Sequence, residues 1–268
     1  MPRYALCAFA LVLAAPAFAQ DEPAEAPVDE TMVPEEEPVL EEVQAAPSTE
    51  SAFDLSGEVG LLSDYRFRGV SRSDEDPAGQ AALTLSHVSG LYAGARGTTL
   101  KGTDAFRRRD PGFSDLGDVE LDLFAGYGAQ LGGGWEMDAG AQYYAFLGGD
   151  GDYVEPYASL SYLIGPAELT AGAKYAPSQD SIGNEDMLYL FGQADVSIPF
   201  RPWRFSALVG HQDWGSFGSY WTWSLGIEHQ LRLGSLPAAQ LGLRYVDTSL
   251  GGTLGADAGV VASLGFRF

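Results

Sequence analysis

Residues 119–127, Val-Glu-Leu-Asp-Leu-Phe-Ala-Gly-Tyr, decide the fold class of this 268-residue chain. Successive side chains of a β-strand point to opposite faces, and here every second residue from Val119 to Tyr127 is apolar. The opposite face carries Glu120 and Asp122. One face therefore suits lipid and the other suits water, which is typical of a transmembrane strand in a β-barrel.

Twelve stretches of the chain carry this alternation, each roughly ten residues long. They predict an all-β fold, a transmembrane antiparallel up-and-down β-barrel of about twelve strands, over residues 51–268. Short connections alternate with mostly longer, more polar ones, as expected for periplasmic turns and external loops. The predicted strands are 54–68, 79–88, 91–100, 117–129, 134–147, 153–164, 167–177, 187–198, 203–213, 220–231, 238–247 and 256–268.

Outward aromatic residues form two groups, one near each end of the predicted strands. Amphipathic rings settle at the two interfaces of a membrane, whereas a soluble β-sandwich would not sort its aromatic residues into two levels. The external group is Tyr65, Phe67, Tyr143, Tyr175, Trp221, Trp223 and Tyr245, and the periplasmic group is Tyr127, Trp135, Tyr162, Trp203, Phe205, Phe266 and Phe268.

The N-terminus has the pattern of an export signal over residues 1–19. Arg3 precedes an apolar stretch, Ala5–Ala15, that is too short to remain in a bilayer, and Ala17–Ala19 fits a cleavage site. Cys7 is the only cysteine and lies inside this signal. We therefore expect a mature chain without thiols, which excludes disulfides and cysteine-ligated metals.

Residues 20–50 differ in composition from everything that follows. They contain eleven acidic residues and five prolines, with no Lys or Arg. Such a segment repels itself and cannot build a core, so we expect a disordered acidic segment. It would act as a solvated spacer or as a periplasmic tether.

Four stretches carry motifs beyond the alternation. They are Ser63-Asp-Tyr-Arg-Phe-Arg-Gly-Val-Ser71, His87-Val-Ser-Gly-Leu-Tyr-Ala-Gly94, Glu120-Leu-Asp-Leu-Phe-Ala-Gly-Tyr127 and Tyr153-Val-Glu-Pro-Tyr157. Together they resemble the TorF family of proteobacterial porins, mainly between residues 53 and 175, and the first stretch is the most specific. The resemblance implies a barrel that serves as a passive pore, and it carries over no substrate and no set of functional residues.

Charged residues concentrate on the inward face, as expected for a wet lumen. A ring of one sign sets the ion preference of a pore, and acids outnumber bases at the periplasmic end, so the sequence predicts a weak cation preference. The alternative is a plugged lumen in which these charges only pair. The periplasmic acids are Glu58, Glu136, Asp138, Glu168, Asp195 and Glu228, opposed by Arg204 and Arg267. The external bases are Arg66, Arg68, Arg96, Lys174 and Arg244, beside Asp64, Glu120, Asp122, Glu155 and Asp257.

The sequence favours an outer-membrane, porin-like channel of a Gram-negative bacterium, through which small hydrophilic solutes diffuse passively. The alternative is a closed barrel that acts as a structural protein, receptor or adhesin through its external loops. A minor alternative is an outer-membrane hydrolase using His211 and Asp213 with Ser216 or Ser219, but their spacing is not specific for catalysis. We therefore expect no enzyme activity, no cofactor and no metal site.

The expected partners are outer-membrane lipid and lipopolysaccharide, the barrel-assembly machinery and small hydrophilic solutes, with no nucleic acid. Phe268, two residues after Phe266, resembles the C-terminal signal that the assembly machinery reads. Arg107–Arg109 lies in the predicted external loop 101–116 and could bind lipopolysaccharide phosphate, although a solvated loop is the simpler interpretation.

Overall fold

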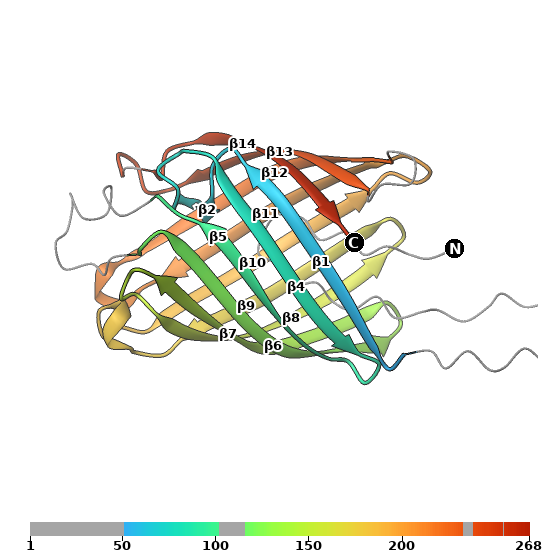
Figure 1. The fold of residues 1–268 in the computed structure, drawn as a ribbon, viewed down its shortest axis with the longest axis horizontal. Helices are drawn as coiled ribbons and strands as arrows, with labels where there is room; N and C mark the ends of the chain where they lie inside the picture. Colours follow the sequence, from blue (N-terminus) through green and yellow to red (C-terminus); the bar gives the residue numbers. More distant parts are fainter. Residues whose placement is uncertain (1–50, 102–115, 233–237, 254) are drawn as a thin grey trace, which may run out of the picture.

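Twelve antiparallel strands close into a barrel in the computed structural model, which describes residues 51–101, 116–232, 238–253 and 255–268 (Figure 1). Strand β1 closes the barrel because it pairs with β4 on one side and with β14 on the other. The barrel strands are β1 (Phe53–Leu62), β4 (Ala78–His87), β5 (Leu91–Thr99), β6 (Val119–Gly132), β7 (Trp135–Leu147), β8 (Tyr153–Ile164), β9 (Ala167–Ala176), β10 (Met187–Ser197), β11 (Trp203–Asp213), β12 (Ser219–Leu231), β13 (Ala239–Thr248) and β14 (Gly259–Arg267). A separate hairpin joins β2 (Arg66–Phe67) to β3 (Val70–Ser71), and two 3-10 turns span Asp180–Ile182 and Gly215–Phe217.

The predicted twelve-stranded antiparallel barrel is confirmed. From β4 onward, each strand pairs with the next one in the chain, as expected for an up-and-down barrel. The predicted signal, 1–19, and the predicted acidic segment, 20–50, lie outside the described residues. Among the residues that are described, no helix has the length and apolar composition needed to cross a membrane.

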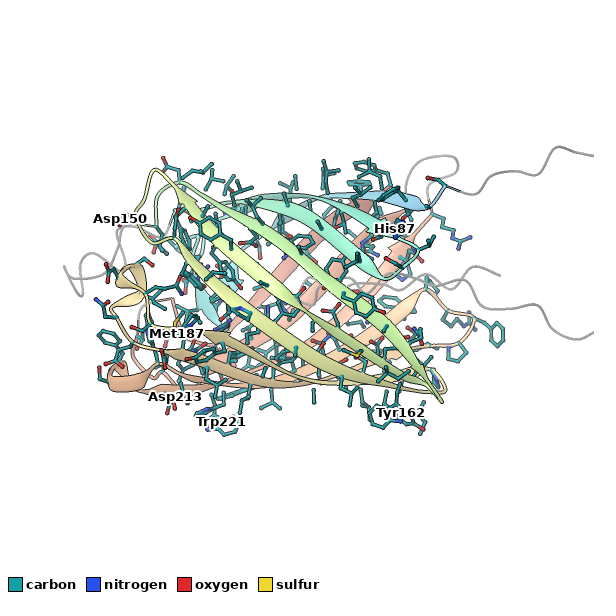
Figure 2. The ribbon with its side chains drawn as sticks, turned by 90° about the horizontal axis from the view of Figure 1, so that it is seen from below. His87, Asp150, Tyr162, Met187, Asp213 and Trp221 are labelled. Carbon is teal, nitrogen blue, oxygen red and sulfur yellow. The ribbon has the colours of Figure 1, made fainter. Side chains whose placement is uncertain are left out.

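The two faces of the barrel wall follow the alternation in the sequence. In β6, Glu120 and Asp122 are fully buried inside the barrel, while Leu123, the residue after Asp122, faces outward and is 44% exposed. Figure 2 shows Trp221 and Tyr162 projecting outward near opposite ends of the barrel. The outer surface is thus apolar between two aromatic levels, as a membrane-spanning barrel requires.

Two predicted strands, the first and the last, are longer than the observed ones. The first was predicted over 54–68, but β1 ends at Leu62, and residues 63–77 fold back into the barrel. Arg66 and Arg68 therefore lie inside the barrel, but on this returning segment and not on the wall. The last strand is also shorter than predicted, because β14 begins only at Gly259.

Candidate functional site

Residues 63–77, which we call the inserted loop, connect β1 to β4 through the lumen. The β2–β3 hairpin lies within this loop and turns at Arg68 and Gly69. Both turn residues have positive φ, 48° and 89°, as a two-residue type I′ turn requires. A Cβ on Gly69 would lie 2.4 Å from Thr248 and 2.6 Å from Thr222 of the wall. Only glycine therefore lets the hairpin tip approach the strands this closely.

Arg68 anchors the tip of the inserted loop to two walls of the barrel. Its guanidinium donates to both carboxylate oxygens of Glu155 on β8 at 2.6 Å, and to Gln212 on β11 at 2.5 Å. It also lies over the rings of Phe67 and Tyr189, 4.7 and 4.5 Å from their centroids. The Arg68 side chain is 5% exposed and that of Glu155 is 0% exposed. This is a buried, hydrogen-bonded ion pair, which is costly to break from one side only.

Arg72 makes a second buried ion pair, with Glu120 on β6. Its guanidinium donates to Glu120 at 2.5 Å, and the hydroxyl of Tyr65 donates to the other carboxylate oxygen at 2.7 Å. Arg72 also lies 3.5 Å from the centroid of the Phe67 ring, which packs edge-on against Tyr144 of β7. The prediction that Tyr65 and Phe67 belong to the external group of outward aromatic residues is therefore wrong, since both pack inside the barrel.

The opposite side of the inserted loop is held near the start of β14. Arg66 donates to Asp64 of its own loop at 2.5 Å and to the backbone carbonyl of Asp257 at 2.5 Å. The backbone N–H of Ser71 donates to the carbonyl of Gly255 at 2.7 Å, and its hydroxyl donates to Asp64 at 2.6 Å. The inserted loop thus contacts opposite sides of the barrel from within the lumen.

An exposed ion pair marks the edge of the inserted loop. Lys101, just beyond β5, donates to Asp76 at 2.6 Å, with side-chain exposures of 64% and 49%. The hydrogen bond that Lys101 donates to Asp76, together with the negative charge of Asp76, raises the pKa of Lys101. Because both groups are in solvent, this pair stabilises the loop much less than the two buried arginine pairs.

Sequence reasoning places Arg72 in an external loop, 69–78, and misses its role inside the barrel. The signal that could reveal the turn is Gly69 between two short alternating stretches, because glycine readily adopts the positive φ that a tight hairpin turn needs. Nothing in the local pattern shows that this hairpin returns to the lumen.

Two of the six predicted periplasmic acids form direct ion pairs with the two bases that were expected to oppose them. Glu58 on β1 accepts from Arg267 on β14 at 2.8 Å, next to the closure of the barrel. Asp195 on β10 lies 3.1 Å from Arg204 on β11. These pairs neutralise part of the predicted acidic ring.

The acids of β7 have neutral hydrogen-bond partners. Asp138 accepts from the hydroxyl of Tyr92 at 2.7 Å, and that hydroxyl lies 2.5 Å from the hydroxyl of Tyr157. Glu136 accepts from the side-chain amide of Gln130. Glu168, on β9, is half-buried on the same side of the lumen. A role of these acids in ion selectivity stays a prediction.

Three of the predicted external bases lie on the barrel wall with their side chains inside the barrel. Arg96 on β5 is 3.9 Å from the carboxylate of Asp122, which is buried. Lys174 on β9 is 4% exposed, and its ammonium lies 5.9 Å from the centroid of the Tyr157 ring. Arg244 on β13 lines a cavity on the opposite wall.

The residues of the hydrolase alternative do not meet as a catalytic group. The ring of His211 faces Trp221 on the outer surface, with centroids 4.7 Å apart. Ser216 donates its hydroxyl to Glu185 in a neighbouring loop. His211 therefore lies among the outward aromatic residues, away from the serine of the hydrolase alternative.

Phe268 lies where the barrel closes. Its backbone exchanges two hydrogen bonds with Gly57 of β1, at 2.8 and 3.0 Å, and a Cβ on Gly57 would lie 2.5 Å from its ring. Phe266 pairs with Val59 in the same seam. A role of the two phenylalanines as an assembly signal stays a prediction, and Arg107–Arg109 lies outside the described residues.

The fold and this lumen define a porin-like β-barrel. Residues 45–262 match the family model described as "Bacterial protein of unknown function (Gcw_chp)", and the chain belongs to this family. Among solved structures it is similar to the NanC porin, with a TM-score of 0.53 and 13% identity over 80% of this chain and 99% of that one. It is also similar to the KdgM porin, with a TM-score of 0.51 and 7% identity over 80% and 97% of the two chains. No curated protein sequence matches the chain.

Proposed function

We propose that this protein is an outer-membrane channel for passive diffusion of small hydrophilic solutes. The observation that carries the proposal is the closed twelve-stranded barrel whose inner face is charged and polar while its outer face is apolar. The similar fold of two small porins supports it, as does the resemblance to the TorF family of porins. The inserted loop would then narrow the external half of the passage.

The proposal places the chain in the outer membrane of a Gram-negative bacterium, after export by the signal at residues 1–19. Its partners are then lipid, lipopolysaccharide and the barrel-assembly machinery, which would read Phe266 and Phe268. The proposal assigns no catalytic activity and no cofactor.

A closed barrel that acts as a structural protein, receptor or adhesin is the second candidate. One observation favours it: the inserted loop is fixed in the lumen by two buried ion pairs, Arg68–Glu155 and Arg72–Glu120. Such a barrel would present its external loops to partners and would conduct nothing.

Planar-bilayer recording of the purified full barrel separates the two candidates. We expect stable ohmic steps, with heat-unfolded protein as the control for bilayer leakage. A variant with residues 65–73 replaced by a short glycine–serine linker should conduct more than the natural chain. Silence of both proteins in bilayers that contain correctly folded barrels would favour the closed barrel.

We also propose a weak cation preference. Of the six predicted periplasmic acids, Glu58 and Asp195 pair with arginines, whereas Glu136 and Asp138 accept hydrogen bonds from neutral groups and can still attract cations there. The preference should fall as salt rises, because the Debye length shrinks from about 10 Å at 0.1 M to about 3 Å at 1 M. A reversal potential measured under a salt gradient tests this, and an anion-selective channel would contradict it.

A further inference from the structure

The two sides of the lumen differ in the size of their side chains. On β5 to β9, aromatic rings lie against glycines of nearby strands. A Cβ on Gly126 would lie 2.5 Å from the hydroxyl of Tyr92 and 2.7 Å from that of Tyr157, and a Cβ on Gly94 would lie 2.4 Å from the ring of Phe124. Rings therefore occupy this side of the lumen.

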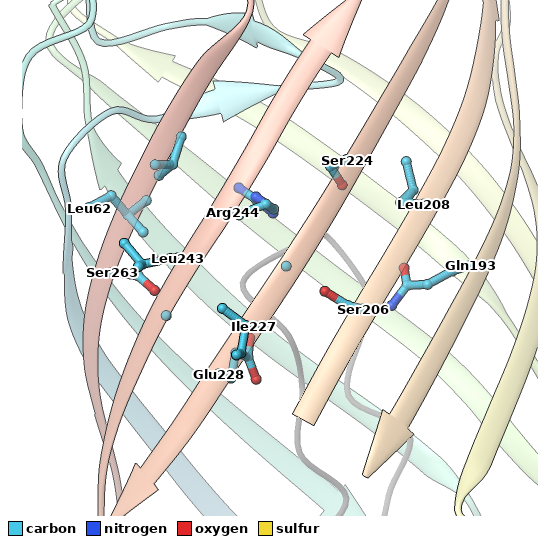
Figure 3. Close-up of a pocket in the computed structure, with 13 residues that line it drawn as sticks. Leu62, Gln193, Ser206, Leu208, Ser224, Ile227, Glu228, Leu243, Arg244 and Ser263 are labelled. Carbon is cyan, nitrogen blue, oxygen red and sulfur yellow. The ribbon is translucent and has the colours of Figure 1, made fainter. Parts of the chain in front are cut away.

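Serines and glycines, together with Leu208 and Val261, line a cavity beside the wall formed by β11 to β14. The cavity has a volume of about 20 Å³, and its serines and glycines are Ser206, Ser224, Ser263, Gly226 and Gly242 (Figure 3). A cavity of this volume holds about one water molecule. This cavity lies against the wall formed by β11 to β14, where the side chains are small.

Three larger polar side chains reach the same cavity. Gln193 on β10 is 6% exposed, and its amide nitrogen donates to Asp195 at 2.5 Å. Its amide oxygen has no hydrogen-bond partner among the described residues. A buried acceptor of this kind calls for a donor from a solute or from water, because buried polar groups are nearly always hydrogen-bonded. Arg244 and Glu228 complete the lining.

Arg244 and Glu228 lie close together because each side chain crosses a glycine of the adjacent strand. A Cβ on Gly226 would lie 3.8 Å from the stem of Arg244, and one on Gly242 would lie 3.7 Å from the stem of Glu228. The register agrees, since Gly226 pairs with Arg244 and Glu228 pairs with Gly242. A positive and a negative group thus share one narrow part of the lumen.

We propose that solutes pass along the wall of β11 to β14, and that Arg244, Glu228 and Gln193 determine which solutes pass. This inference rests on the proposed channel function and names its solute class. The site offers donors from Arg244 and acceptors from Glu228 and Gln193. It suits small polar solutes that carry both donors and acceptors, uncharged or zwitterionic, and it disfavours ions with several charges of one sign.

If solutes pass along one wall, charged residues on that wall should affect ion selectivity more than those on the opposite wall. Charges beside the path act on a passing ion through a short, poorly screened distance, so Arg244→Gln should increase cation preference and Glu228→Gln should decrease it. The double change of Glu136 and Asp138 to Gln and Asn, on the ring-lined side, should shift the reversal potential less than Glu228→Gln does.

Single cysteines test the path directly, because Cys7 is the only natural cysteine and lies in the predicted signal. Ser224→Cys places a thiol beside the cavity, and Ser159→Cys is the matched change on β8. We expect a positively charged methanethiosulfonate reagent to reduce the single-channel current of Ser224→Cys at least about twofold, since it narrows and charges the path. The current of Ser159→Cys should change much less.

Controls separate failure of folding or modification from absence of block. Heat-modifiable gel mobility checks folding, mass spectrometry checks modification, and Ser263→Cys on the same wall serves if Ser224→Cys does not fold. If the reagent reduces the currents of Ser159→Cys and Ser224→Cys equally, or leaves the current of a modified Ser224→Cys unchanged, the inference is wrong. Conduction by the unmodified barrel would still support the proposed channel. Absence of current in the unmodified barrel refutes the channel and the inference together.

Discussion

Removing one charge of the buried pair between Arg68 and Glu155 should release the inserted loop. The change Glu155→Gln keeps the volume of the side chain but leaves the Arg68 guanidinium, 5% exposed, without its counter-ion. Breaking one side of a buried ion pair costs roughly 3 to 5 kcal/mol, and an amide that still accepts one hydrogen bond puts the cost near 3. At about 1.4 kcal/mol for each factor of ten, the released population should rise roughly a hundredfold.

Limited trypsin digestion measures this population without any assumption about conduction. Trypsin cleaves after arginine, and Arg68 and Arg72 become accessible only when the loop leaves the lumen. The cleavage rate follows the open population while opening and closing are fast compared with cleavage. Asp76→Asn is the matched control, because it makes the same carboxylate-to-amide change in the exposed pair with Lys101 and should alter the rate little. Cleavage of Glu155→Gln no faster than that of Asp76→Asn would refute the reasoning.

Three further predictions concern topology, assembly and packing. A cysteine at Asp150 should react with an impermeant thiol reagent on intact cells, whereas one at Gly133 should not, since the two positions lie at opposite ends of the barrel. Labelling at Gly133 and not at Asp150 would mean that the barrel has the opposite orientation in the membrane. Deleting Phe268 should lower the yield of heat-modifiable barrel at the cell surface. A normal yield would mean that Phe268 is only an interfacial residue and not an assembly signal. Gly126→Ala should destabilise the barrel by about 1 to 3 kcal/mol in urea unfolding through overpacking against Tyr92, whereas Gly97→Ala, with open space around it, should not.

The barrel could be predicted because lipid and water impose a two-residue period on every spanning strand. The alternation at 119–127 falls inside β6, and that at 221–229 falls inside β12. Turns were equally readable, because glycine-rich connections such as 132–134 adopt positive φ at all three positions. The N-terminal half of the barrel and the C-terminal half obey the same rule.

The inserted loop could not be predicted from the alternation of residue types. Alternation shows that the two faces of a segment have different surroundings, but it does not show whether the apolar face meets lipid or packed side chains. At Asp64 to Arg68, charged and aromatic residues alternate as in a strand, but the aromatic side meets packed side chains of the lumen in place of lipid. The decisive contacts join distant parts of the chain: Arg68 bonds Glu155, 87 residues away, and Arg66 bonds Asp257, 191 residues away. No local window of sequence contains both members of such a pair.

The candidate site shows the same division between wall and lumen. Parity places Glu228 and Arg244 on the inward face, but their proximity depends on the glycines opposite them, which let both stems lie along the wall. Likewise, the number of strands bounds the width of the barrel, while rings over glycines on one side and serines on the other decide where free space remains. Substitutions that exchange ring and serine positions between the two walls should therefore move the passage, although the strand count and the register stay the same.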